Sequence, residues 1–202
     1  MSTVKHTSVV RQKAALWLQV ITLSWMLAEL AVSMYAALTA HSPALLAFGS
    51  DSLVEVLSAT VVILQWLPRF SLPERQAAQI AAVLLFVLAV VVTGIAAASF
   101  ILKQHPETSY AGIGITVTAL AVMPLLAWAK RREARRNGNR ALAADAVQSA
   151  TCAYLALITL CGLVGHALFG VVWFDPLAAL VAVPILVKEG KDAWRGHNCG
   201  CC

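Results

Sequence analysis

The chain has 202 residues, of which 60% are hydrophobic and 12% are charged, and its formal net charge at pH 7 is +5. A soluble globular domain is roughly 45–50% apolar, so this composition, with a mean hydropathy of +0.78, excludes an ordinary soluble fold. Apolar runs fill the chain from Ala14 to Val187, and the segment after them is too short to form its own core. We therefore expect one membrane domain over residues 1–190 and a short cysteine-rich tail over residues 191–202.

Six of these apolar runs are long enough to be transmembrane helices, because a helix needs about 20 apolar residues to cross a bilayer. Proline, glycine and asparagine separate the runs, as they do in turns. The pattern predicts an all-α membrane protein of one six-helix domain. The expected spans are 14–38, 43–66, 77–102, 110–129, 141–166 and 173–188.

The basic residues indicate how these spans are oriented. All 15 Lys and Arg residues except Lys103 fall before span one, between spans two and three, between spans four and five, or after span six. By the positive-inside rule both termini are expected in the cytoplasm, and we expect the location to be a bacterial inner membrane. Six of the basic residues lie in the 130–140 loop, which we interpret as a topology signal. Binding of anionic lipid or nucleic acid is the lesser alternative for this loop, and no nucleic-acid partner is expected for the protein.

Four carboxylates lie within the apolar runs. An ionised carboxylate at the bilayer centre costs at least a few kcal/mol, so such a residue indicates a transport pathway or a binding site. Asp51 and Glu55 are four residues apart and share one face of a helix. Interhelical hydrogen bonding of the protonated acids is the alternative for this pair. Glu29 and Asp145 lie in spans one and five, and the role of Glu29 stays open between metal binding, proton transfer and bonding across helices.

Span five places Asp145, Gln148 and Cys152 on one face, because their spacing is i, i+3 and i+7. Together with the acids of span two they offer carboxylate oxygens, an amide oxygen and a thiolate, a donor set that suits Zn²⁺ and not Mg²⁺. The alternatives are an ion pair of Asp145 with Arg140, and ordinary packing roles for Gln148 and Cys152.

A weak internal repeat relates spans two and five. Residues 44–55 can be laid over residues 141–152, which matches Asp51 with Gln148 and Glu55 with Cys152. The two spans run in opposite directions, and two inverted three-helix halves with a site near the midplane are a common plan of transporters.

Three segments carry a resemblance to a known family. Residues 44–55, 141–146 and 173–180 resemble, in this order, motifs of the second, fifth and sixth helices of the cation diffusion facilitators, which are metal/proton antiporters chiefly of zinc. Asp51 and Glu55 occupy the two metal-binding places of the second-helix motif. The resemblance implies a cation-efflux transmembrane domain and a homodimer, and it is to a short branch that lacks the usual C-terminal cytoplasmic domain.

Span five departs from the family pattern. The family usually has a His and an Asp where this chain has Gln148 and Cys152, so the resemblance implies that Cys152 binds as a thiolate or that Asp145 supplies an oxygen. We therefore hypothesise proton-coupled export of zinc, or of cadmium, mercury or cobalt. The alternative is a non-transporting membrane metal sensor or a scaffold for a partner. No permanently bound cofactor is expected, and no nucleophile–base pair or phosphate loop indicates an enzyme.

The chain ends in Cys199, Cys201 and Cys202, on the expected cytoplasmic side. Cytosolic thiols are normally reduced, so a structural disulfide is not expected. Three thiols beside His197 form a plausible soft-metal capture site. Lipidation of the cysteines and a tail without function are the alternatives.

Overall fold

The computed structural model describes residues 2–64, 74–102, 107–137 and 140–195. Within these ranges the side chains at 2–16, 54, 58–64, 74–75, 77–78, 81, 137, 140–145 and 193 lie outside the description.

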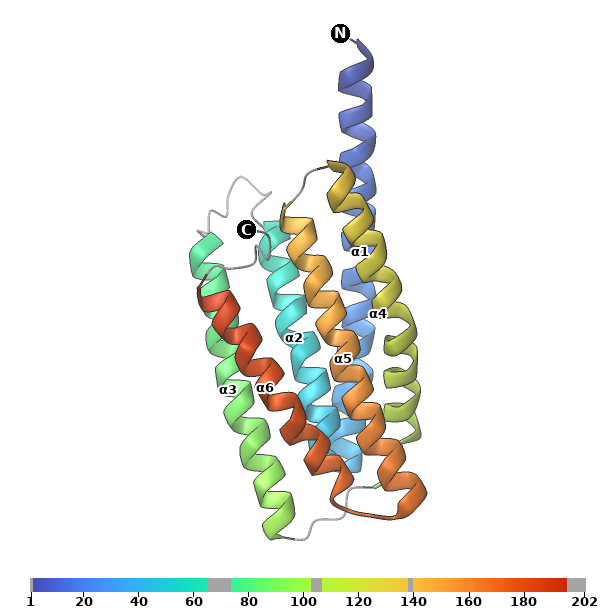
Figure 1. The fold of residues 1–202 in the computed structure, drawn as a ribbon, viewed down its shortest axis with the longest axis vertical. Helices are drawn as coiled ribbons and strands as arrows, with labels where there is room; N and C mark the ends of the chain where they lie inside the picture. The colour runs from blue at the N-terminus through green and yellow to red at the C-terminus, as the bar shows by residue number, and fades with distance from the viewer. Residues whose placement is uncertain (1, 65–73, 103–106, 138–139, 196–202) are drawn as a thin grey trace.

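Six helices make up the described chain (Figure 1). Each contains one of the apolar runs, and the sequence has Pro, Gly or Asn in or directly after every connection between them. α1 begins and α6 ends at the same end of the bundle (Figure 1). The helices are α1 (Ser2–Ala40), α2 (Pro43–Leu64), α3 (Glu74–Ile101), α4 (Tyr110–Asn137), α5 (Arg140–Phe169) and α6 (Phe174–Trp194).

Three helices continue well beyond the expected spans. α1 begins at Ser2, whereas its span was expected to begin at residue 14. α4 reaches Asn137, so the basic residues from Lys130 to Arg136 are helical, and the expected basic loop is reduced to the short connection before Arg140. Arg and Lys are good helix formers, and basic residues in the last turn are favoured by the helix dipole. α6 reaches Trp194, so the domain boundary expected at residues 190/191 falls inside a helix.

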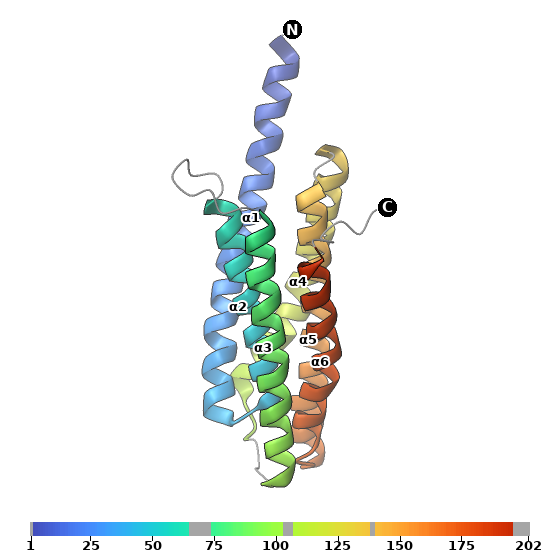
Figure 2. The same ribbon diagram turned by 90° about the vertical axis from the view of Figure 1, so that its left-hand side faces the viewer.

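The helices form two layers, α1–α2–α3 and α4–α5–α6 (Figure 2). Across the layers α1 packs on α4, α2 on α5 and α6, and α3 on α6. The first and second halves of the chain thus form one layer each, and α2 contacts four other helices. This position surrounds the carboxylates of α2 with protein.

Large apolar side chains cover the outside of the bundle. Val90, Leu125, Tyr154 and Leu168 are each more than 60% exposed, which is the reverse of a water-soluble surface and is expected of a surface that faces lipid. Four helices of the described chain contain segments long and apolar enough to cross a membrane: Trp17–Ala40, Ala82–Ile101, Tyr110–Arg136 and Ala146–Phe169.

Small residues let the helices around the interior approach closely. A Cβ atom added at Gly49 of α2 would lie 2.6 Å from Oγ of Ser33 on α1, and one added at Gly162 of α5 would lie 2.6 Å from Cβ of Ala178 on α6. A larger residue at either place would push two helices apart. This close packing of small residues is typical of helices in membranes.

The start of α2 is fixed by Asp175 of α6. Ser42 caps α2 by accepting a hydrogen bond from the backbone N of Leu45 at 3.1 Å. The Ser42 hydroxyl in turn donates to Asp175 Oδ1 at 2.6 Å, and the backbone N of Ala44 donates to Asp175 Oδ2 at 3.3 Å. Asp175 lies in the first turn of α6, yet its buried carboxyl group satisfies the N-terminus of the neighbouring helix α2.

Replacing Asp175 with Ala is expected to lower the free energy of unfolding by about 1–3 kcal/mol, because buried donors of Ser42 and Ala44 lose their acceptor. Thermal unfolding of the purified protein in detergent measures the change. Glu107→Ala, at an exposed position near the same end of the bundle, is the matched control and should unfold like the wild type. Equal stability of the two variants would contradict the capping role.

Candidate metal site

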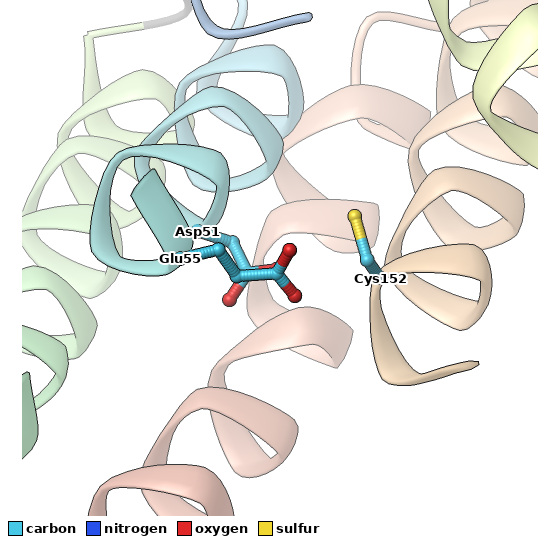
Figure 3. A group of neighbouring side chains, drawn as sticks. All are labelled: Asp51, Glu55 and Cys152. Carbon is cyan, nitrogen blue, oxygen red and sulfur yellow. The ribbon is translucent and has the colours of Figure 1, made fainter. Parts of the chain in front are cut away.

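The acids of α2 converge with a thiol of α5 in the interior. Asp51 and Glu55 lie one helical turn apart on α2 and point toward Cys152 of α5 (Figure 3). One ligand atom from each of the three side chains lies within 4.8 Å of the others. All three residues are buried, with exposed fractions of 2%, 5% and 0%. The structure therefore brings together both candidate ligands of α2 and one of those proposed on α5.

Two carboxylate oxygens of this cluster lack a hydrogen-bond donor among the described residues. They are Asp51 Oδ2 and Glu55 Oε1, although each carboxyl group has other interactions. Buried polar atoms are nearly always hydrogen-bonded, and an exception needs an explanation such as a missing ion. Three acidic groups so close together also repel one another when ionised. A cation among them, or protons on them, would relieve both problems.

The donor set fits a borderline or soft divalent cation. Zn²⁺ binds carboxylate oxygen and thiolate sulfur tetrahedrally, with bonds of about 2.0–2.3 Å that hold the ligand atoms roughly 3.3–3.8 Å apart. The candidate ligand atoms of Asp51, Glu55 and Cys152 lie within 4.8 Å of one another, so binding of Zn²⁺ would draw them to these separations. The thiol favours Zn²⁺ and softer ions over Mg²⁺, which prefers oxygen ligands alone.

Glu29 of α1 is hydrogen-bonded to Cys152 of the cluster and to Ser52 beside Asp51. Its Oε1 accepts hydrogen bonds from Ser52 Oγ at 2.6 Å and Cys152 Sγ at 3.4 Å, and its Oε2 accepts one from Trp25 Nε1 at 2.8 Å. Of the three roles that were open for Glu29 from the sequence, the structure shows one, hydrogen bonding across helices. Such partners orient metal ligands and are important for affinity.

Glu189 of α6, which the sequence did not indicate as a site residue, also contacts this cluster. Its carboxyl group is hydrogen-bonded to the side chains of Asp51 and Thr151. Glu189 follows the apolar run and stands beside Lys188, so its sequence context indicated only a helix end. Glu189 lies about four helical turns after Asp175, so both residues lie on the side of α6 that faces α2. This spacing is the feature of the sequence that could have identified Glu189 as a site residue.

Lys130 of α4 is a second residue with an unexpected place. The sequence counted it with the basic loop, but its side chain is completely buried, and its Nζ donates a hydrogen bond to Ser149 Oγ at 2.9 Å. Ser149 lies about one turn before Cys152 on α5. A buried ammonium group with a hydrogen-bonded partner thus lies at the α4–α5 contact.

The remaining candidates are not part of the described cluster. Gln148 is half-buried on α5, one turn before Cys152. Asp145 lies in α5, but its side chain and that of Arg140 are outside the description, so the ion pair weighed for them stays a prediction. Cys199, Cys201 and Cys202 lie outside the described residues.

Comparison with protein families identifies the family of this chain. The family model described as "Cation efflux transmembrane domain" matches residues 74–193, more than half of the chain. The match spans α3 to α6 and so includes Cys152 and Glu189. No curated protein matches the chain. The predicted resemblance is confirmed: the chain belongs to the cation efflux family and is an integral membrane protein that transports metal cations.

Proposed function

We propose that this transporter exports zinc, or another thiophilic or borderline divalent cation such as cadmium, mercury or cobalt, in exchange for protons. The convergence of Asp51, Glu55 and Cys152 carries this proposal. These groups can hold either a divalent cation or protons, because both relieve the repulsion among them. Competition between the two for the same atoms is the simplest basis for coupled exchange.

The proposed orientation has six membrane-spanning helices and cytoplasmic termini. The start of α1 and the end of α6 lie at the same end of the bundle (Figure 1), as an even number of spans requires. The basic residues of α4 from Lys130 to Arg136 lie in its last turns, and α4 ends at this same end (Figure 1). By the positive-inside rule we expect this end to lie in the cytoplasm.

Transport requires the helices around the site to move. Asp51, Glu55 and Cys152 are almost completely enclosed, so a cation cannot enter or leave while the helices are packed as they are. We propose that α2 and α5, which carry the ligands, shift against α3 and α6 to open the site to each side in turn. Asp145 and Gln148 of α5 are further oxygen donors in this proposal, and the tail cysteines are a cytoplasmic capture site.

Asp51→Asn and Glu55→Gln are each expected to reduce metal flux at least about tenfold, because each removes a charged ligand without changing the volume of the side chain. The assay is metal uptake into proteoliposomes under a pH gradient, with zinc and cadmium. Glu107→Gln replaces an exposed carboxylate and should transport like the wild type.

The same assay separates the proposal from its rivals. A sensor or scaffold would bind metal but show no flux that depends on Asp51. A channel would conduct equally well without the pH gradient. Either result would contradict proton-coupled export.

Cys152→Ser is expected to weaken cadmium binding at least about tenfold and manganese binding much less, because a hydroxyl group replaces a soft ligand. Loading the protein with Co²⁺ reports the bond directly, since a thiolate ligand gives a near-ultraviolet charge-transfer band. To remove the contribution of the tail, all proteins also carry Ser at positions 199, 201 and 202. Cys161→Ser on the same helix, at an exposed cysteine, is the control. A charge-transfer band of full strength in Cys152→Ser would exclude Cys152 as a ligand.

A further inference from the structure

We propose that Glu189 is a further residue of the cation pathway, which binds the cation together with Asp51 as it passes between the interior site and the end of the bundle where α6 ends. This inference rests on the proposed transport through the Asp51–Glu55–Cys152 site. It adds a third helix, α6, to the two that supply the cluster.

The contacts of Glu189 connect the two ligand-bearing helices. Its carboxyl group is hydrogen-bonded to Asp51 of α2 and to Thr151 of α5. Thr151 directly precedes Cys152 in the chain. Glu189 therefore lies between a neutral hydroxyl group and one acid of the cluster, and its charged neighbours on α6 are Lys188 and Asp192.

Glu189 differs from the other acids of the interior in its access to the outside. Glu29, Asp51 and Glu55 are buried, whereas Glu189 is half-buried. The next turn of α6 carries Lys191, which is exposed, and Asp192, which is half-buried. Charged residues at a helix end indicate the polar interface of a membrane. Glu189 thus lies between this polar end and the enclosed acid Asp51.

The Asp51–Glu189 contact is suited to a shared proton or to a bound cation. Ionised carboxylates only accept hydrogen bonds, so two that lie in contact need a cation or a proton between them. Asp51 is buried, and its Oδ2 accepts no hydrogen bond within the described residues. One oxygen from each acid and the hydroxyl group of Thr151 would form an oxygen-only station beside the sulfur-containing site.

The Asp51–Glu189 position and the site with Cys152 are expected to have different roles in transport. An oxygen-only station binds hard and borderline divalent cations without favouring soft ones, whereas the site with Cys152 favours the softer ions. Glu189 is therefore expected to control how well any divalent cation is loaded, and Cys152 to control which cation is kept. The two residues should have distinguishable effects on zinc and on manganese.

The experiment compares the full-length wild type with Glu189→Gln, Glu189→Asp, Thr151→Val and Asp192→Asn. Zinc and manganese are the probes, in equilibrium binding to the purified protein and in proteoliposome flux. Glu189→Gln should raise the flux KM and the binding Kd of both ions about tenfold, with a maximal flux within about twofold of the wild type. Glu189→Asp should recover part of the loss. Asp192→Asn, the same change one turn further along α6, should have little effect.

The results test the role of Glu189 separately from the proposed transport function. Unchanged Kd and KM in Glu189→Gln would overturn it. A fall in maximal flux with unchanged KM, shared by Glu189→Gln and Thr151→Val, would also overturn it, because it would show a purely structural link between helices. If the wild type binds metal without transporting it, the proposed function fails, while the Kd of Glu189→Gln still decides the role of Glu189. A wild type that binds neither ion overturns both.

Discussion

The constraint on which this structure depends is the concentration of acidic groups in an interior that excludes water. Asp51, Glu55 and Cys152 are buried together, and Glu29 is hydrogen-bonded to Cys152. Ionising a buried acid without a partner costs several kcal/mol, and the cost rises when a like charge lies beside it. The interior is therefore most stable with protons or a cation among its acids, which is the physical condition for exchange of one for the other.

The fold holds these acids together by fixing α2. Its first turn is tied to α6 through Ser42 and Asp175, and its middle packs closely on α1 at Gly49. Ser52, beside Asp51, is bonded to Glu29 of α1. Helices in lipid gain no hydrophobic stabilisation from association, so close packing and hydrogen bonds of this kind position them. The same few contacts must loosen if α2 moves during transport, and none of them is an ion pair that would hold it permanently.

Much of this structure could be predicted from the sequence, because the bilayer requires long apolar helices and makes buried carboxylates conspicuous. The six helices, the family and the shared face of Asp51 and Glu55 all followed from such patterns. Glu189 did not, because a charged residue beside Lys188 at the end of an apolar run resembles any helix terminus. Lys130 did not either, since a basic cluster gives no sign of which member turns inward. The convergence of Cys152 with α2 was expected from the polar face of span five, the internal repeat and the resemblance. Its contact with Glu29 depends on tertiary packing that no spacing encodes.

The central claim, that the interior cluster binds the transported metal, is tested most directly by the zinc X-ray absorption spectrum of the purified protein with Ser at positions 199, 201 and 202. The account predicts one sulfur ligand at about 2.3 Å and oxygen ligands at about 2.0 Å around the zinc. It also predicts that the sulfur ligand disappears in the Cys152→Ser variant and that the metal is lost in the Asp51→Asn variant. A zinc shell without sulfur, or one that neither substitution changes, would contradict the account.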